Sequence, residues 1–325
     1  MELFAKAGGS VLFPESVPVA MAAATTTRPT GTPPATLTPP DAELTWLMLT
    51  WHTSPLSRVF DVLKDILPDV SMVARAETLE LFAMNAADSC LVNMCLEAQG
   101  FVRYLFAPVS SETDSITINV RVATVARLLK LAVSSDWLAM YVRRDDPTML
   151  HVSTATRTSA SVYSMRMLSL QLQEMHVNPG LAYDLSVRLC GSSLRDAVGK
   201  IKPLGKGDAQ RCVAVWFDEG GLHVRGKTQV GFTEYAENNI AVAENAKLTK
   251  ERTLFHVPQN LLAKITKAAI ITPNVDMELW MRTTQGEERT IMLRYTVAFF
   301  GHVGFIVMDQ GADTDPAIYA CADST

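Results

Sequence analysis

The octapeptide GLHVRGKT at Gly221–Thr228 fits the spacing of a phosphate-binding loop, G-x-x-x-x-G-K-[ST]. In such a loop, backbone amides and a lysine hold nucleotide phosphates, and the loop needs a strand before it and a helix after it. Here apolar and polar residues alternate from Leu222 to Arg225, as in a strand, and Gln229–Thr233 carries no helical pattern. We therefore expect a chance match. A P-loop nucleotide hydrolase stays as a remote alternative, which loss of ATP turnover in Lys227→Ala would support.

The other reactive side chains form no catalytic pattern either. The six histidines show no metal-ligand spacing such as HxxxH, and the five cysteines include no CxxC pair. No nucleophile elbow is present. Free thiols in a reducing compartment are the expected state of the cysteines. We expect no enzymatic activity, no metal and no cofactor.

Positive charge is instead concentrated on four predicted amphipathic helices. Each has an apolar stripe at helical spacing and at least two cations on the opposite face. The helices are expected at Pro55–Leu67, Val122–Ala132, Ser192–Lys202 and Pro258–Ala268. If the four lie on one surface, their cations can contact phosphates without reading bases. No aromatic residues are interleaved, which favours a duplex backbone over stacking on single strands.

The alternative for these helices is an ordinary solvated face of mixed sign. Asp61, Asp65 and Asp196 lie among the cations and keep that alternative open. The net charge of −5 argues against a protein that coats nucleic acid generally, but not against a local basic surface.

The length of 325 residues, 48% hydrophobic and 19% charged, predicts a globular protein with more than one core. No apolar run reaches transmembrane length, and the N-terminus does not resemble a secretory signal. We expect no membrane association.

Short apolar runs between the helices predict many strands. In the first half they are expected at Leu44–Trp51, Val70–Ala74, Thr78–Met84, Cys90–Glu97, Phe101–Phe106, Ser115–Val120, Trp137–Arg143 and Met149–Ser153. In the second half they are expected at Tyr183–Leu189, Arg211–Phe217, Leu222–Arg225, Gln229–Tyr235, Thr253–Val257, Val275–Met281, Thr290–Thr296 and Val303–Val307. A unit of strand, helix and strands thus recurs four times in two pairs. The fold class is α+β with antiparallel sheets.

Five segments follow from this pattern. Residues 1–43 are expected to form a disordered tail because they contain the Pro/Thr-rich run Ala24–Asp41. A folded domain is expected at 44–166 and a second at 184–310, with a flexible tail at 311–325. The stretch Tyr163–Tyr183 is interpreted as a connector, bounded at 167–183. It alternates from Leu168 to Met175 before an Asn178-Pro179-Gly180 turn.

Several pieces of the chain, in order, resemble one known family. Leu81–Met94 (LFAMNAADSCLVNM), followed by Gly100-Phe101, resembles the first-domain signature of proliferating cell nuclear antigen, the sliding clamp. The likeness continues through Asn119-Val120 and the connector to Gly301-His302-Val303, and it covers about residues 44–310.

The resemblance implies two clamp-type domains, with sheets outside and basic helices inside, in a homotrimeric ring around duplex DNA. The implied function is that of a polymerase processivity factor in DNA replication and repair, put onto DNA by a clamp loader and binding DNA polymerase and other proteins. The expected DNA-binding residues are Arg58, Lys64, Arg127, Lys130, Arg195, Lys200, Lys202, Lys264 and Lys267. The expected partner-peptide residues are Met84, Ser89, Leu91, Met175, Val177, Tyr183 and Met308. Subunits are expected to join by edge pairing of Met149–Thr154 with Thr228–Ala236.

The chain also departs from the family pattern. Asp196 stands where the family has an arginine, and Met308-Asp309 replaces an Ala-Pro pair. A divergent lineage, such as a large DNA virus, fits these departures. The implied location is the nucleus, or a viral replication compartment. The alternatives are a checkpoint-type subunit of a mixed ring, a monomeric or dimeric processivity factor, and a scaffold protein without DNA contact.

Overall fold

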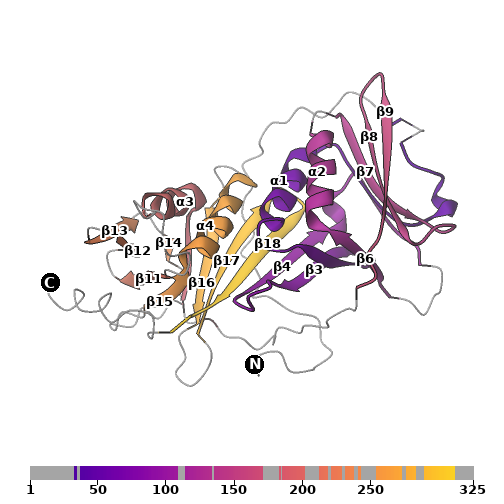
Figure 1. The fold of residues 1–325 in the computed structure, drawn as a ribbon. Helices are drawn as coiled ribbons and strands as arrows, with labels where there is room; N and C mark the ends of the chain where they lie inside the picture. Colours follow the sequence, from indigo (N-terminus) through magenta and orange to yellow (C-terminus); the bar gives the residue numbers. More distant parts are fainter. Residues whose placement is uncertain are drawn as a thin grey trace.

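The computed structural model of the protein describes residues 33–34, 37–108, 114–133, 135–170, 183, 185–201, 212–218, 221–228, 231–237, 241–242, 254–272, 276–282 and 289–311. These residues form three antiparallel sheets and four α-helices. The helices stand in a row along one side of the molecule, and the sheets form the other side (Figure 1). The predicted α+β class with antiparallel sheets and few helices is confirmed.

The first half of the chain, to residue 166, contains two of the helices. Its strands are β1 (Leu44–Thr50), β2 (Asp69–Ala74), β3 (Thr78–Met84), β4 (Cys90–Glu97), β5 (Arg103–Phe106), β6 (Ile116–Arg121), β7 (Trp137–Arg143), β8 (Met149–Ala155) and β9 (Ala160–Arg166). Its helices are α1 (Thr53–Leu63) and α2 (Val122–Ala132), with 3₁₀ turns η1 (Asp41–Glu43) and η2 (Ala98–Gly100).

The second half repeats the order. Its strands are β10 (Leu185–Cys190), β11 (Cys212–Asp218), β12 (Gly221–Thr228), β13 (Gly231–Glu237), β14 (Ala241–Val242), β15 (Phe255–Pro258), β16 (Asp276–Arg282), β17 (Thr290–Val297) and β18 (Gly301–Met308). Its helices are α3 (Gly191–Lys200) and α4 (Gln259–Ile265), and α4 runs on into the 3₁₀ turn η3 (Thr266–Ile270). The predicted recurrence of strand, helix and strands is therefore present four times among the described elements.

One sheet of nine strands, sheet B, contains strands of both halves in the order β14-β10-β16-β17-β18-β4-β3-β2-β6. The halves meet where β18 pairs with β4, from Gly301 opposite Leu96 to Val307 opposite Cys90. The strands approach closely at Gly301, whose φ is +141° and where a Cβ would collide with the carbonyl oxygen of Cys95. Only glycine fits this position.

Two smaller sheets lie at the two ends of the molecule (Figure 1). Sheet A has the order β5-β1-β7-β8-β9, and sheet C has the order β13-β12-β11-β15. Strands β9 and β13 are therefore edge strands at opposite ends.

This order corrects the strand expected at the subunit edge. Met149–Thr154 lies in β8, which pairs with β7 on one side and with β9 on the other. A strand paired on both sides has no free row of backbone groups for a second chain. The edge strand is β9, so Tyr163–Arg166, which the sequence assigned to the connector stretch, belongs to sheet A.

A continuous apolar core fills the space between the helices and the sheets of both halves. Helix α2 packs on this core through Val122, Val125 and Leu129, which are buried and lie on one face at helical spacing. Helix α1 ends at Leu63, four residues earlier than predicted, and the amide of Leu67 donates to the carbonyl of Leu63 in the turn that follows. Lys64 and Asp65 therefore lie in this turn, beyond the helix.

Part of the predicted N-terminal tail packs against sheet A. Leu37 is 1% exposed and contacts the apolar face of β1 and β7 that points away from the main core, with Leu47 and Tyr141 in the same cluster. Its amide donates to the carbonyl of Pro34 at 2.9 Å. The expectation of a disordered tail is therefore wrong for Leu37–Glu43, because this face of sheet A offers apolar contacts that a leucine can fill. Most of the tail, the connector residues 171–182 and the tail 312–325 lie outside the described residues.

Candidate DNA-facing and partner-binding surfaces

The four helices make one layer whose outer surface carries most of the predicted DNA-binding residues. Helix α1 packs on α2, and α3 packs on α4 and η3, while α1 also contacts η3. Arg127, Lys130, Arg195, Lys200 and Lys267 are exposed, and Arg58, Lys64 and Lys264 are half-buried. Lys202 lies outside the described residues. The amphipathic spacing of each helix positions these cations, because its apolar stripe is held against the sheets.

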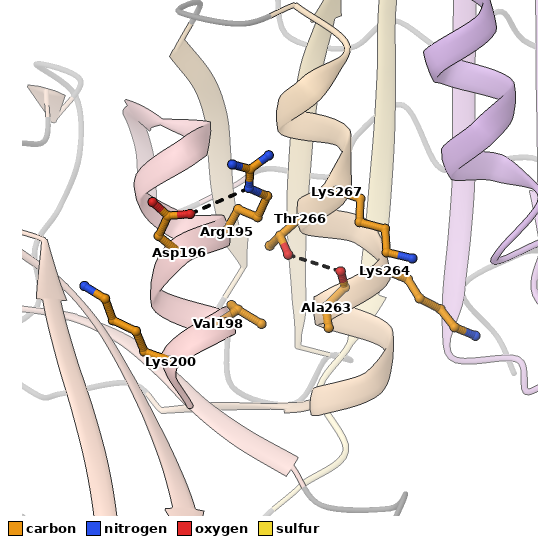
Figure 2. Close-up of a pocket in the computed structure, with 9 residues that line it drawn as sticks. Arg195, Asp196, Val198, Lys200, Ala263, Lys264, Thr266 and Lys267 are labelled. Carbon is orange, nitrogen blue, oxygen red and sulfur yellow. Dashed lines mark hydrogen bonds and ion pairs between the residues drawn. The ribbon is translucent and has the colours of Figure 1, made fainter. Parts of the chain in front are cut away.

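A hollow of about 680 Å³ lies between α3 and α4 on this surface. Its charged lining residues are Arg195, Asp196, Lys200, Lys264 and Lys267, so cations outnumber acids four to one. Figure 2 shows Lys264 and Lys267 extending from α4 and η3 toward α1, while Lys200 points away on the far side of α3. The hollow is open and positively charged, which suits a phosphate backbone better than a small enclosed ligand.

Asp61 lies between two of these cations. Its Oδ1 is 2.7 Å from Nζ of Lys130 on α2 and also accepts a hydrogen bond from Lys64. Burial raises the pKa of Asp61, but the hydrogen bonds from Lys130 and Lys64 outweigh burial and hold the pKa below its usual value. The hydrogen bond to Asp61 in turn raises the pKa of Lys64. Asp61 and Lys64 are thus both charged at neutral pH.

Further contacts join the helices of the two halves. Oδ2 of Asp65 is 2.6 Å from Nζ of Lys267. Arg58 Nη1 donates to the carbonyl oxygen of Ile270 at 2.8 Å. The guanidinium of Arg58, which the sequence suggests as a DNA contact, is therefore engaged in the joint between α1 and η3. From the sequence, the two aspartates appear only as acidic residues among the cations. The spacing within one helix does not show which residues of another helix they contact.

The predicted partner-binding residues lie on the opposite face of sheet B. Along β4, Val92 and Met94 face the main core, whereas Leu91 belongs to a separate apolar cluster. Strand alternation therefore places Leu91 on the face away from the helices. Met84 and Tyr183 pack in the same cluster. Met175 and Val177 lie outside the described residues.

Ser89 and Met308 border this cluster at the end of the sheet. The amide of Met308 donates to the carbonyl of Ser89 at 3.2 Å. Asn85 fixes the β3–β4 turn, since its Oδ1 accepts from the amides of Ser89 and Cys90. Five of the seven predicted residues are thus described, and the structure brings these five to one end of sheet B.

Four members of the cluster were missed from the sequence. Met292 and Ile306 are buried in it, and Phe82 and Trp280 pack around them. The rings of Trp280 and Tyr183 meet edge to face, with centroids 5.8 Å apart. Burial raises the pKa of Tyr183 to about 12, so its hydroxyl stays neutral. The available signal was that β16, β17 and β18 carry apolar residues at both alternating sets of positions, although only one set can face the helices.

Next to this apolar cluster, the same face of sheet B is charged. Glu278 lies 3.3 Å from Arg188 and 3.6 Å from Arg294. Arg294 Nη2 lies 3.1 Å from Nδ1 of His302. Burial and the charge of Arg294 lower the pKa of His302 to about 3, so this imidazole is neutral. The apolar cluster is thereby bounded by a polar row.

The motif Gly221–Thr228 forms strand β12, paired with β11 and β13. The next described element is a strand, so the arrangement lacks the helix that a phosphate loop requires. Within the described ranges, no group of three His, Cys, Asp or Glu side chains could hold a metal ion. No described helix is both long and apolar enough to cross a membrane.

Comparison with known families gives a match over much of the first half. Residues 50–176 match the family model described as "Proliferating cell nuclear antigen, N-terminal domain". The matched segment includes α1, α2, β2 to β9 and the β3–β4 turn beside the apolar cluster.

Proposed function

The chain belongs, through residues 50–176, to the proliferating cell nuclear antigen family of sliding clamps, and on this premise we propose that it is a DNA polymerase processivity factor that encircles duplex DNA. The observation that carries the proposal is the row of described helices backed by sheets on the other side (Figure 1). The outer surface of this row exposes cations at Arg127, Lys130, Arg195, Lys200 and Lys267. In the proposed ring the helices would line the hole and the sheets would form the wall.

The cations support contact with the phosphate backbone and not with bases. They are spread over α2, α3, α4 and η3, and none of the described residues that line the hollow of Figure 2 is aromatic. Lysine and arginine contacts to phosphates release counterions, so they are weak and salt-dependent when few. A clamp held by topology needs contacts of this kind, because tight or sequence-specific contacts would prevent sliding.

The two edge strands support assembly of the ring. Strand β9 lies at one end of the molecule and β13 at the other (Figure 1). Pairing of β9 with β13 of the next copy is head-to-tail, and such an interface closes into a ring when the rotation per copy is right. Six of the seven β9 residues are exposed, among them Val162 at 53%. An exposed edge of this length is a template for pairing. We propose a homotrimer with two clamp-type domains in each copy.

The apolar cluster on sheet B supports the recruitment of partners. A short peptide with aliphatic and aromatic anchors fits the half-buried side chains of Met84, Tyr183 and Trp280, which pack in one cluster with the buried Leu91 and Ile306. Proteins that contain such a peptide would be DNA polymerase, repair enzymes and a clamp loader. The chain would act without catalysis or cofactor, in the nucleus or in a viral replication compartment.

The test is primer extension by a polymerase from the same source on circular template DNA. Arg127→Glu with Lys264→Glu reverses two cations of the helical layer, and neither forms an ion pair within the described part of the chain. Arg144→Glu reverses one exposed cation on the rim of sheet A, away from the helical layer, and is the control for position. We expect the double variant to lose most of the stimulation while its mass in solution is unchanged, and the control to stimulate normally. Equal stimulation by all three proteins would reject the channel.

A further inference from the structure

We propose that Asp61 and Asp65 weaken the clamp's grip on DNA by pairing with three of its own DNA-facing lysines. The inference rests on the proposed function and adds an internal regulator to it. The two aspartates would set how strongly the helical layer holds a phosphate backbone, and so how freely the clamp slides.

Asp61 occupies the centre of a three-member cluster on the first half of the layer. Lys64 and Lys130 both bind its Oδ1, the second at 2.7 Å. The depressed pKa of Asp61 shows that it stays ionised at neutral pH. One carboxylate thus offsets two of the predicted phosphate contacts.

Asp65 acts on the second half of the layer. It holds Nζ of Lys267 at 2.6 Å, and Lys267 also lines the positive hollow between α3 and α4. Figure 2 shows this lysine directed toward α1 and not toward α3. Its charge is therefore drawn away from the hollow by the aspartate.

These pairs are accessible to a competing phosphate. The side chains of Asp61 and Asp65 are about one-third exposed, and those of Lys130 and Lys267 are about half exposed. A lysine that already has a carboxylate partner must give up that partner to bind a phosphate, so it contributes less to DNA affinity than a free lysine does. The aspartates compete with DNA for the same ammonium groups.

The test measures the salt at which the full chain elutes from immobilised duplex DNA, together with the salt dependence of the retention. We expect Asp65→Asn to elute at higher salt than the parent, with the slope of log K against log salt steeper by about 0.9 for one released lysine. Asp61→Asn should shift elution further, because it releases two lysines. Asp65→Glu keeps the charge and should elute with the parent.

A double variant separates the release of a lysine from a general gain of positive charge. Asp65→Asn with Lys267→Gln lacks both members of the pair and should return to the parent's elution position. Asp145→Asn is the matched control, since Asp145 pairs with Arg143 at 2.7 Å on the rim of sheet A, away from the helices. Asp145→Asn changes the net charge by the same amount as Asp65→Asn, and it should elute at the same salt concentration as the parent.

The outcomes are distinct. If Asp145→Asn shifts as much as Asp65→Asn, or if the double variant elutes with Asp65→Asn, the inference is overturned while the clamp function stands. If Arg127→Glu with Lys264→Glu lowers retention but neither aspartate variant raises it, the inference fails alone. If the parent is not retained at any salt and stimulates no polymerase, the proposed function fails, and the inference with it. Asp65→Asn breaks one exposed pair, so its test does not depend on the folding of Asp61→Asn.

Discussion

Asp65 and Lys267 are 202 residues apart in the sequence, yet their side chains form an ion pair on the surface of the helical layer. This pair joins the turn after α1 to η3, and Arg58 makes a second contact in the same joint through the carbonyl of Ile270. The two halves of the chain are therefore linked through the helices as well as through sheet B. An exposed pair of this kind contributes about 0–1 kcal/mol, so most of the joint's stability comes from the paired strands and the shared core.

The close approach of β18 to β4 predicts a strong effect of Gly301→Ala. An alanine at a φ of +141° is strained, and its Cβ would collide with Cys95. We expect a loss of about 2–4 kcal/mol in the free energy of unfolding, measured by urea denaturation. Gly199→Ala is the control, because Gly199 lies in α3 with open space around its Cα, and it should stabilise the protein by about 0.5–1 kcal/mol. Equal stability of Gly301→Ala and the parent would contradict the close approach.

The buried carboxylate of Asp309 should make the stability of the protein depend on pH. Its side chain is 5% exposed, accepts from the amide of His256 at 2.8 Å and lies 3.2 Å from Arg289. Burial raises its pKa, but the hydrogen bonds from His256 and the charge of Arg289 outweigh burial and keep the pKa low. Asp309→Asn should therefore cost about 1.5–3 kcal/mol at pH 7.

The sign of the pH effect follows from the lowered pKa. The carboxylate stabilises the fold above its unfolded pKa of about 3.9, and this contribution is lost as the pH falls through the lower folded pKa. The difference between the parent and Asp309→Asn should hence shrink in acid, as followed by urea denaturation from pH 7 to pH 3. The exposed Asp276→Asn should show no comparable difference. A constant gap at every pH would rule out the carboxylate as its source.

We expect Trp280 to contribute to partner binding, a role that the sequence did not suggest. Its ring packs against Tyr183 beside the apolar cluster of sheet B. Trp280→Ala should weaken binding of a partner peptide by about 2 kcal/mol, or roughly 30-fold, measured by fluorescence anisotropy with a labelled peptide from the polymerase. Phe299→Ala removes an aromatic ring that is 40% exposed beyond the other end of β18, and it should leave the affinity unchanged. A peptide that loses affinity for Phe299→Ala instead would bind at the other end of the sheet.

The exposed edge of β9 leads to a prediction about the number of chains in the assembly. Val162→Glu puts charge on the exposed edge and should reduce the mass measured by light scattering from three chains to one. Val102 is 44% exposed but lies before β5, so Val102→Glu should leave the mass unchanged. A parent chain that is already monomeric would favour a mixed ring or a non-ring processivity factor, and pull-down of other subunits would then distinguish these two.

Sequence patterns predicted those elements that are apolar runs with sharp polar ends. The bounds of β3, β4, α2 and β7 agree with prediction. Helix α2 buries one stripe at helical spacing, whereas β4 and β7 are apolar on both faces because each strand lies between two apolar clusters. Strand β9 was missed because both of its faces are largely exposed, which removes the alternation of apolar and polar residues. The end of α1 was placed too late because Lys64 and Asp65 are compatible with a helix, and only the turn to Leu67 ends it.

The candidate surfaces were predicted in part for a similar reason. The spacing of residues in each helix predicts which cations lie opposite its apolar stripe. Once the helices share one layer, these cations must lie on the same side of it. The partners of those cations cannot, because Asp61 meets Lys130 only where α1 packs on α2. Trp280 and Met292 were missed because outward-facing apolar residues look like core residues when both faces of a strand are apolar.

The pairing of β4 with β18 also has a consequence for synthesis of the protein on the ribosome. β18 is the last strand that the structure describes, about two hundred residues after its neighbour, so the contact order of this pair is high. While the second half is still being translated, the nascent first half presents β4 with one unpaired edge and the apolar residues that β18 later covers. Such an edge favours intermolecular pairing. A chain truncated before β18 would therefore need chaperone protection more than the finished one, and would be the form most prone to aggregate.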